Sequence, residues 1–227
     1  MKKYIEILKN NPLFRGLSED KLLSILDQAG AVISRKRAGE YIFHAGDTTA
    51  SMGFVLSGSI LVIQEDLWGH RNIMAKLAPG NVFAELFAAV PGSVLNVSVA
   101  ADTDCELLFL NMNRLLNSGF PPANLISVLA GKTMAFNDKI SHISKRSTRD
   151  KLLSFLSAQA VQTGSPSFDI AYNRQQLADY LCVDRAAMSV ELSRLQKDGF
   201  LRYHKNHFEL RESGERACMT TTKKTAE

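Results

Sequence analysis

Apolar residues change their spacing several times along the chain, and each change predicts a different kind of structure. Residues 1–29 show helix-like spacing that is broken at Pro12 and Gly16, and Ser18 is a candidate N-cap for a second short helix. From Ala31 to about Leu110, short β-rich runs alternate with glycines. Strands are expected at 32–33, 41–43, 54–56, 60–63, 73–75, 94–100 and 106–110. Many short strands with regular turns predict an all-β barrel or jelly roll, which can hold one ligand.

A long helix is predicted after Pro121 and Pro122, where a different apolar spacing begins. Its apolar positions are spaced 3, 4, 3, 4 and 3 residues apart and form one narrow seam. The members of this seam are Ile126, Leu129, Thr133, Phe136, Ile140 and Ile143. So narrow a seam favours a helix that pairs with a copy of itself, while an amphipathic helix lying on the barrel is the alternative. We expect a homodimer whose interface is this helix, over residues 121–146.

Two short helices joined by a tight turn are predicted further along the chain. Asn173 and Asp184 are candidate N-caps for helices 174–181 and 185–197, and Gly199 follows the second helix as a stop signal. Helices joined by a turn of three residues predict a helix-turn-helix. The alternating residues that follow, 200–203 and 208–210, predict a β-hairpin wing.

The second helix of a helix-turn-helix enters the major groove of DNA, where its N-terminal side chains reach base edges. Arg185 can bond guanine O6 and N7 together, and Ser189 can bond a purine edge or a phosphate. Polar side chains and backbone amides at the start of the first helix are placed to hold phosphates. On the wing, Lys205 and His204 would add phosphate contacts. The candidate DNA-binding residues are therefore Asn173, Arg174, Gln175, Arg185, Ser189 and Lys205.

The charge distribution agrees with a nucleic-acid module in the C-terminal part of the chain. Residues 1–120 hold 11 basic and 12 acidic side chains, whereas residues 145–227 hold 14 and 10. The net charge of +4 thus comes from the region that would meet a polyanion. No apolar run approaches the roughly 18 residues of a membrane helix, and polar residues interrupt the N-terminal MKKYIEILKNNP. A cytoplasmic protein without a membrane partner is expected.

Three cysteines, Cys105, Cys182 and Cys218, stand far apart in the sequence. They offer neither a disulfide framework nor a Cys-x-x-Cys metal pair, so reduced and mostly buried thiols are expected. Their number excludes a four-cysteine iron–sulfur cluster. Haem would need a ligand such as His44, His70 or Cys105, and a lone histidine is more often solvated or structural. No cofactor or metal site is identified, and the tail from Cys218 is expected to be flexible.

The chain resembles the CRP/FNR family, the cyclic-AMP receptor protein and its relatives, over about residues 10–211. The stretches that carry the resemblance are AGEYIFHAGD (38–47), MGFVLSGSILV (52–62), LAPGNVFAEL (77–86), residues 100–103 and NRQQLADYLCVDRAAMSVELSRLQKDG (173–199). The family implies an α+β fold with a cyclic-nucleotide-binding-type β-roll over 1–120, a dimerisation helix over 121–146 and a winged helix-turn-helix over 147–227. It also implies a transcription regulator, not an enzyme, with near-palindromic double-stranded DNA and RNA polymerase as partners.

The sensor departs from the family pattern where cyclic nucleotides bind. Ala84 and Glu85 stand in place of the Gly-Glu pair that binds ribose, and Leu95 and Asn96 stand in place of the Arg-Ser pair that holds the cyclic phosphate. No arginine lies between Arg71 and Arg114. Because a buried phosphate needs a paired cation, cyclic AMP is not expected, and a less polar effector is favoured. The candidate effector pocket comprises Ala84, Glu85, Leu86, Leu95, Asn96 and Val97.

The recognition helix also departs from the family. Many relatives carry a glutamate and an arginine at the positions of Ala186 and Val190, so these two complete the set of candidate DNA-binding residues and predict an unfamiliar operator sequence. Two other functions compete with this interpretation. One is a cyclic-nucleotide module of a signalling enzyme or channel, which the complete helix-turn-helix opposes. The other is a cupin-like enzyme, whose metal would have only His44, His70 and Glu85 as ligands.

Overall fold

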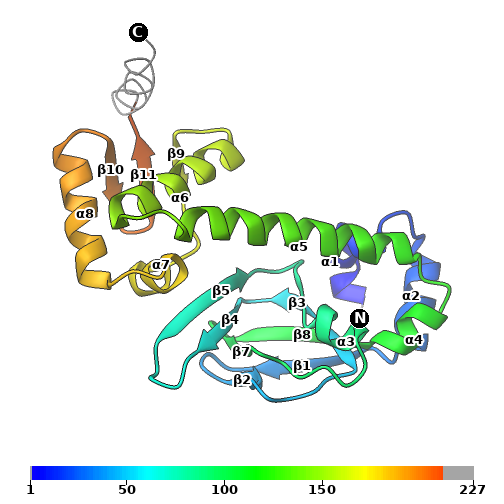
Figure 1. Cartoon of the computed structure of the whole chain (residues 1–227). Helices are drawn as coiled ribbons and strands as arrows, with labels where there is room; N and C mark the ends of the chain where they lie inside the picture. The colour runs from blue at the N-terminus through cyan, green and yellow to red at the C-terminus, as the bar shows by residue number, and fades with distance from the viewer. Residues whose placement is uncertain (1, 212–227) are drawn as a thin grey trace, which may run out of the picture. The chain divides into compact units, whose positions relative to one another are not determined.

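The computed structural model describes residues 2–211, which divide into two compact units with the boundary between Ala135 and Phe136 (Figure 1). The tail expected from Cys218 onward, including that cysteine, lies outside the described residues. The first unit begins with short helical segments: η1 (Lys2–Tyr4), α1 (Ile5–Lys9), η2 (Pro12–Phe14) and α2 (Glu19–Gln28). Ser18 caps α2 as expected, because its hydroxyl accepts a hydrogen bond from the Lys21 amide at 3.3 Å.

Eight strands of the first unit form two four-stranded antiparallel sheets, which together make the β-roll. One sheet has the order β1-β8-β3-β6 and the other β2-β7-β4-β5. The strands are β1 (Val32–Lys36), β2 (Tyr41–Phe43), β3 (Ser51–Ser57), β4 (Ile60–Glu65), β5 (Arg71–Leu77), β6 (Val82–Phe83), β7 (Ser98–Ala101) and β8 (Cys105–Asn111). Every run predicted as a strand overlaps one, and β6 was not predicted.

Within the run 94–100 the strand β7 begins only at Ser98, and Val94 makes no more than an isolated β-bridge with Thr48. Before β7, Leu95 exchanges backbone hydrogen bonds with the glycine turn at Gly46 and Asp47, each at 2.8 Å. These bonds occupy the amide and carbonyl that a ladder would use. The prediction of a strand over 94–97 was therefore wrong, and the turn holds Leu95 and Val97 with their side chains buried.

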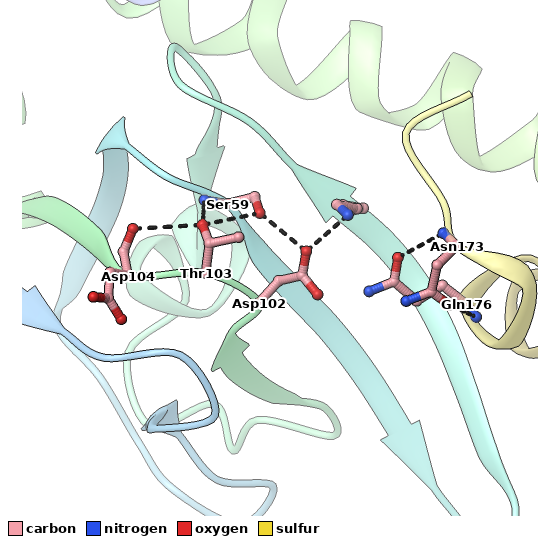
Figure 2. A network of polar contacts seen from close by, with 7 residues as sticks. Ser59, Asp102, Thr103, Asp104, Asn173 and Gln176 are labelled. Carbon is pink, nitrogen blue, oxygen red and sulfur yellow. Dashed lines mark hydrogen bonds and ion pairs between the residues drawn. The ribbon is translucent and has the colours of Figure 1, made fainter. Parts of the chain in front are cut away.

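Polar contacts fix the turns of the β-roll (Figure 2). The Ser59 amide donates to Thr103 Oγ1 at 2.9 Å and the Ser59 hydroxyl to Asp102 Oδ2 at 3.1 Å. Lys76 Nζ of β5 lies 2.7 Å from the same Asp102 oxygen. The turn between β3 and β4 is thereby joined to the turn between β7 and β8 and to the edge strand of its sheet.

An aromatic cluster fills the space between the sheets. Phe43, Phe83 and Phe109 meet edge to face, with ring centroids 5.9 to 6.3 Å apart. Gly53 lies against the Phe83 ring, and a Cβ at this position would overlap it. Glycine is therefore required in β3 for steric reasons.

Three helices complete the first unit: α3 (Glu85–Ala89), α4 (Met112–Asn117) and the N-terminal part of α5 (Pro122–Ile143). The sequence predicted only the last of them. Leu125 is buried in the core that the N-terminal helices share with β3 and β8, and Val128 and Leu129 pack against it. The side-chain Nδ2 of Asn124 donates hydrogen bonds of 3.0 Å to the carbonyls of Leu13 and Arg15. The start of α5 is thus part of the sensor unit.

The second unit holds the end of α5, then α6 (Thr148–Thr163), β9 (Ser167–Asp169), α7 (Arg174–Leu181), α8 (Arg185–Lys197), β10 (Leu201–His204) and β11 (His207–Leu210). The predicted bounds of α7 and α8 are confirmed, and the predicted hairpin is present, with strand bounds that differ by one residue. The sequence missed β9, which pairs with β11. Asn173 and Gln176 form a reciprocal capping box at the start of α7, with bonds of 2.9 and 3.0 Å (Figure 2). Among the helices of residues 2–211, none combines the length and apolarity needed to cross a bilayer.

Candidate nucleic-acid interface and sensor site

The N-terminal half of α8 presents an exposed face. Met188, Leu192 and Leu195 are buried in the core of the second unit, and this fixes the rotation of the helix. Asp184 caps the helix by accepting from the Ala187 amide at 2.8 Å. The four side chains predicted to face bases from this helix are all exposed; they are Arg185, Ala186, Ser189 and Val190. This face can enter a major groove without rearrangement of the core.

Ser189 and Glu191 show how polar groups on α8 are used in the free protein. The Ser189 hydroxyl donates to the Arg185 carbonyl at 2.9 Å, which leaves its oxygen able to accept from a base. Glu191 pairs with Arg194 at 2.6 Å on the surface of the helix. Arg185, in the first turn of the same helix, is exposed.

The residues predicted to hold phosphates are arranged in two ways. Asn173, Gln175 and Lys205 are exposed, although Asn173 caps α7 and Gln175 donates to Asp179 Oδ1 at 2.7 Å. Arg174 is instead half-buried, with its guanidinium over two aromatic rings of the wing. Only part of the predicted phosphate-binding set is therefore presented freely to solvent.

The last turns of α5 carry two buried basic residues that no motif or spacing in the sequence singles out. His142 Nδ1 lies 2.8 Å from the Ser154 hydroxyl of α6, and its ring meets Phe155 edge to face. Lys139 lies 4.8 Å above the ring of Tyr180 of α7. Burial lowers the pKa of Lys139 to about 8 and also lowers the pKa of His142. These contacts anchor the end of the long helix in the DNA-binding unit.

In the sensor, Glu85 is bound by a residue of the long helix. Ala84 has the left-handed backbone conformation, with φ of 59°, and places Glu85 at the start of α3, where only 2% of the residue is exposed. Lys132 Nζ lies 2.7 Å from Glu85 Oε1 and donates to the Val82 carbonyl at 2.7 Å. Burial lowers the pKa of Lys132, and the charge of Glu85 opposes this shift. Glu85 Oε2 is buried without a hydrogen-bond partner among the described residues.

The other predicted pocket residues divide into buried and exposed groups. Leu95 and Val97 are buried, whereas Leu86 and Asn96 are exposed. Of the predicted pocket residues, Glu85 and the apolar Leu95 and Val97 are thus buried, whereas Asn96 faces solvent. Lys132, the cation that pairs with this carboxylate, was missed because it lies far beyond Glu85 in the chain.

Two family models match the chain, one on each unit. The model of the cyclic nucleotide-binding domain matches residues 34–118, and the model of the Crp-like helix-turn-helix domain matches residues 150–212. Their order and positions agree with the β-roll and with the winged helix-turn-helix described above. The chain belongs to the CRP/FNR family of transcription regulators. The fold and function of this family are those of regulators, not of enzymes.

Two curated members of the family are similar over most of their length. The cyclic AMP receptor protein of Thermus thermophilus is 26% identical over 211 residues, which cover 91% of this chain and 95% of the relative. The fumarate and nitrate reduction regulatory protein of Salmonella typhimurium is 28% identical over 190 residues, or 78% of this chain and 74% of the relative. A solved structure of a CooA mutant from Carboxydothermus hydrogenoformans has the same fold, with a TM-score of 0.71, 19% identity and coverage of 90% and 97%.

The residues that could bind a haem or metal in a CRP/FNR sensor lie apart from one another. His44 stacks on Tyr41 at the surface, and His70 is bonded to Asp66 at 2.8 Å in the turn between β4 and β5. Cys105 is buried, and burial raises the pKa of its thiol. Within residues 2–211, no group of three His, Cys, Asp or Glu side chains is placed to hold a metal ion.

The burial expected of the cysteines is correct for Cys105 and wrong for Cys182. Cys182 ends α7 in the left-handed backbone conformation, with φ of 52°. The side chain of a residue in the turn of a helix-turn-helix lies outside the packed faces of the two helices, so Cys182 is exposed.

Proposed function

We propose that this CRP/FNR-family regulator works as a homodimer that binds a near-palindromic operator, with its DNA affinity set by a signal that the β-roll senses. The observation that carries the DNA-binding part is the exposed face of α8, with Arg185 at its first turn and an apolar opposite face locked in the core. RNA polymerase is the expected second partner. The expected location is the cytoplasm, where the operator DNA would be found.

The apolar side chains of α5 support pairing of two copies. Ile126, Phe136 and Ile140 belong to the predicted seam and are 66%, 47% and 53% exposed in the single chain. Three large apolar residues on one helical stripe are better buried against another helix than left in water. A parallel pair through this stripe would present two copies of α8 to one duplex, and each copy would read one half-site.

The effector is proposed to be something other than cyclic AMP. A bound cyclic phosphate needs a cation, but Leu95 and Asn96 stand where that cation is expected. Glu85, which would bind the ribose, is already paired with Lys132 at 2.7 Å. The Thermus relative is called a cyclic AMP receptor protein, but this name describes the ligand of that protein and not the effector of this chain. An effector of this chain must bind one arrangement of the dimer better than the other, because only differential affinity shifts the equilibrium.

The first test replaces the base-reading arginine. The variant Arg185→Ala is expected to lose discrimination at one base pair in each half-site, at a cost of about 1–3 kcal/mol, because the bidentate contact with guanine is removed. Competition binding with operator variants, each substituted at one position, measures this effect. The variant Lys197→Ala, at the exposed far end of α8, serves as a control with the same loss of charge. An unchanged preference in Arg185→Ala at every position would contradict the assignment of α8.

The second test concerns the effector. Calorimetric titration of the protein with cyclic AMP is expected to give no binding heat, and the nucleotide is expected to leave the thermal unfolding midpoint unchanged. The physical reason is the missing cation for the phosphate. Saturable binding in the micromolar range would refute this part of the proposal while leaving DNA binding untouched.

A further inference from the structure

Arg174 joins the start of the helix-turn-helix to the wing. Its guanidinium lies 4.7 Å from the ring centre of Tyr203 and 5.0 Å from that of Phe208, one from each strand of the hairpin. Its Nη2 donates to the Lys205 carbonyl at the tip of the hairpin at 2.7 Å. Arginine can stack its planar guanidinium on aromatic rings and at the same time donate hydrogen bonds from its edge. The ammonium group of lysine is not planar and cannot make this combined contact.

The turn that Arg174 holds has a backbone that needs support. Lys205 and Asn206 form the two-residue turn between His204 and His207, which pair across the hairpin. Lys205 has φ of 52°, a region that favours glycine at the first position of such a turn. Both turn carbonyls are bonded from outside the hairpin: Arg174 binds that of Lys205, and the Ile170 amide binds that of Asn206 at 2.9 Å. A strained turn persists when its surroundings fix it in this way.

The same contacts leave Arg174 poorly placed for a phosphate. Its Nη1 is buried and has no hydrogen-bond partner among residues 2–211, and its Nη2 is engaged with the Lys205 carbonyl. Burial lowers the pKa of this guanidinium. A bidentate contact with a phosphate needs two N–H groups on one free edge, and the fork of Arg174 does not offer them. Lys205, by contrast, is exposed at the tip of the turn.

We propose that Arg174 is a positioning residue: it clamps the Lys205 turn to the start of α7 and thereby sets where the Lys205 ammonium meets the DNA backbone. Arg174 acts on DNA through the wing and not through a phosphate of its own. The clamp itself is a property of the free protein, and only its consequence for DNA rests on the proposed function.

The first experiment measures the clamp without DNA. Hydrogen exchange of the hairpin amides, over 201–210, is compared in the full chain and in Arg174→Ala, with Arg202→Ala as a matched loss of arginine from the same hairpin. Arg202 is exposed on β10. In Arg174→Ala the amides around the turn are expected to exchange about tenfold faster, since the turn opens more often. Arg174→Lys is expected to behave like Arg174→Ala, and Arg202→Ala like the parent. Unchanged exchange in Arg174→Ala would overturn the proposal.

The second experiment is a double-variant cycle on DNA. Affinity for a random-sequence duplex is measured over a range of salt for the parent, Arg174→Ala, Lys205→Ala and the double variant. Lys205→Ala is expected to lower the salt slope by about one phosphate contact. Once Arg174 is removed, the Lys205 substitution is expected to have less than about a twofold further effect, because the ammonium is no longer held in place.

A direct phosphate contact by Arg174 gives the opposite pattern. The two substitutions would then be additive, the double variant would lose about two units of salt slope, and Arg174→Lys would restore most of the affinity. Any of these results would overturn the proposal. Failure of the parent itself to bind the duplex would contradict the proposed function instead, and the exchange experiment would still decide whether the clamp exists.

Discussion

The variant Ile140→Glu is expected to be monomeric and to bind its operator at least roughly a hundredfold more weakly than the parent. Ile140 is half-exposed on the stripe of α5 that we propose to be the dimer seam. Two copies would bring two carboxylates together in an apolar interface, where burying an unpaired charge is costly. A monomer holds one half-site only, so it loses the gain that comes from linking two binding modules.

Sedimentation equilibrium measures the subunit number, and fluorescence anisotropy with operator DNA measures the affinity. The matched control is Ser141→Glu, which adds the same charge to the same helix at the next, exposed position outside the seam. This control is expected to remain dimeric. A dimeric Ile140→Glu variant with the affinity of the parent would show that α5 is not the interface.

The variant Lys132→Met is expected to reduce the free energy of unfolding of the sensor by about 3 kcal/mol at neutral pH. Lys132 is the cation on Glu85, whose side chain is 3% exposed and whose second oxygen already has no hydrogen-bond partner among the described residues. Removal of the ammonium leaves a buried carboxylate without a counter-charge. Urea unfolding followed by circular dichroism measures the loss.

The charge explanation is tested by a second substitution at the same site. Adding Glu85→Gln to Lys132→Met is expected to recover most of the lost stability, because replacing both charged partners removes the uncompensated charge. Lys9→Met, which removes an exposed lysine from α1, is expected to leave the stability unchanged. If the single variant Lys132→Met is as stable as the parent, the ion pair does not stabilise the sensor.

The long helix α5 makes contacts in both the sensor unit and the DNA-binding unit. Within the sensor unit its Lys132 holds Glu85, and within the DNA-binding unit its His142 is bonded to Ser154 of α6. Between them lies the apolar stripe of Phe136 and Ile140. The helix that carries the proposed dimer stripe thus contacts the sensor carboxylate near one end and α6 near the other. We propose that an effector alters DNA affinity by acting on this helix.

The parts of the fold that local signals determine could be predicted from the sequence. The bounds of α7 and α8 followed from Asn173 and Asp184, because side chains that cap a helix act within three residues of its start. Glycine turns likewise marked the strands of the β-roll. The strand expected from position 94 failed because Leu95 is bonded to a turn about fifty positions earlier, at Gly46 and Asp47, which its own neighbours do not reveal.

The site residues that were missed depend on tertiary contacts. The pairing of Lys132 with Glu85 and the burial of His142 have no signature in periodicity or spacing. Arg174 was interpreted from its position at the start of the first helix as a phosphate contact. In the structure its guanidinium also lies over the rings of Tyr203 and Phe208 of the later hairpin, a contact that its position in the sequence did not reveal. A sequence shows that a charge is present, whereas its partner is set by the packing of distant elements.

The measurement that tests the central claim most directly is selection of DNA fragments from the source genome by the purified protein, carried out with and without cell extract, followed by salt titration on the best fragment. The expected result is enrichment of a two-fold symmetric site whose half-sites lie about one helical turn apart, with an affinity that falls steeply as salt rises. Enrichment only with extract would show in addition that an effector is required. Failure to enrich any site under either condition would contradict the assignment of residues 173–200 as a DNA-reading helix-turn-helix.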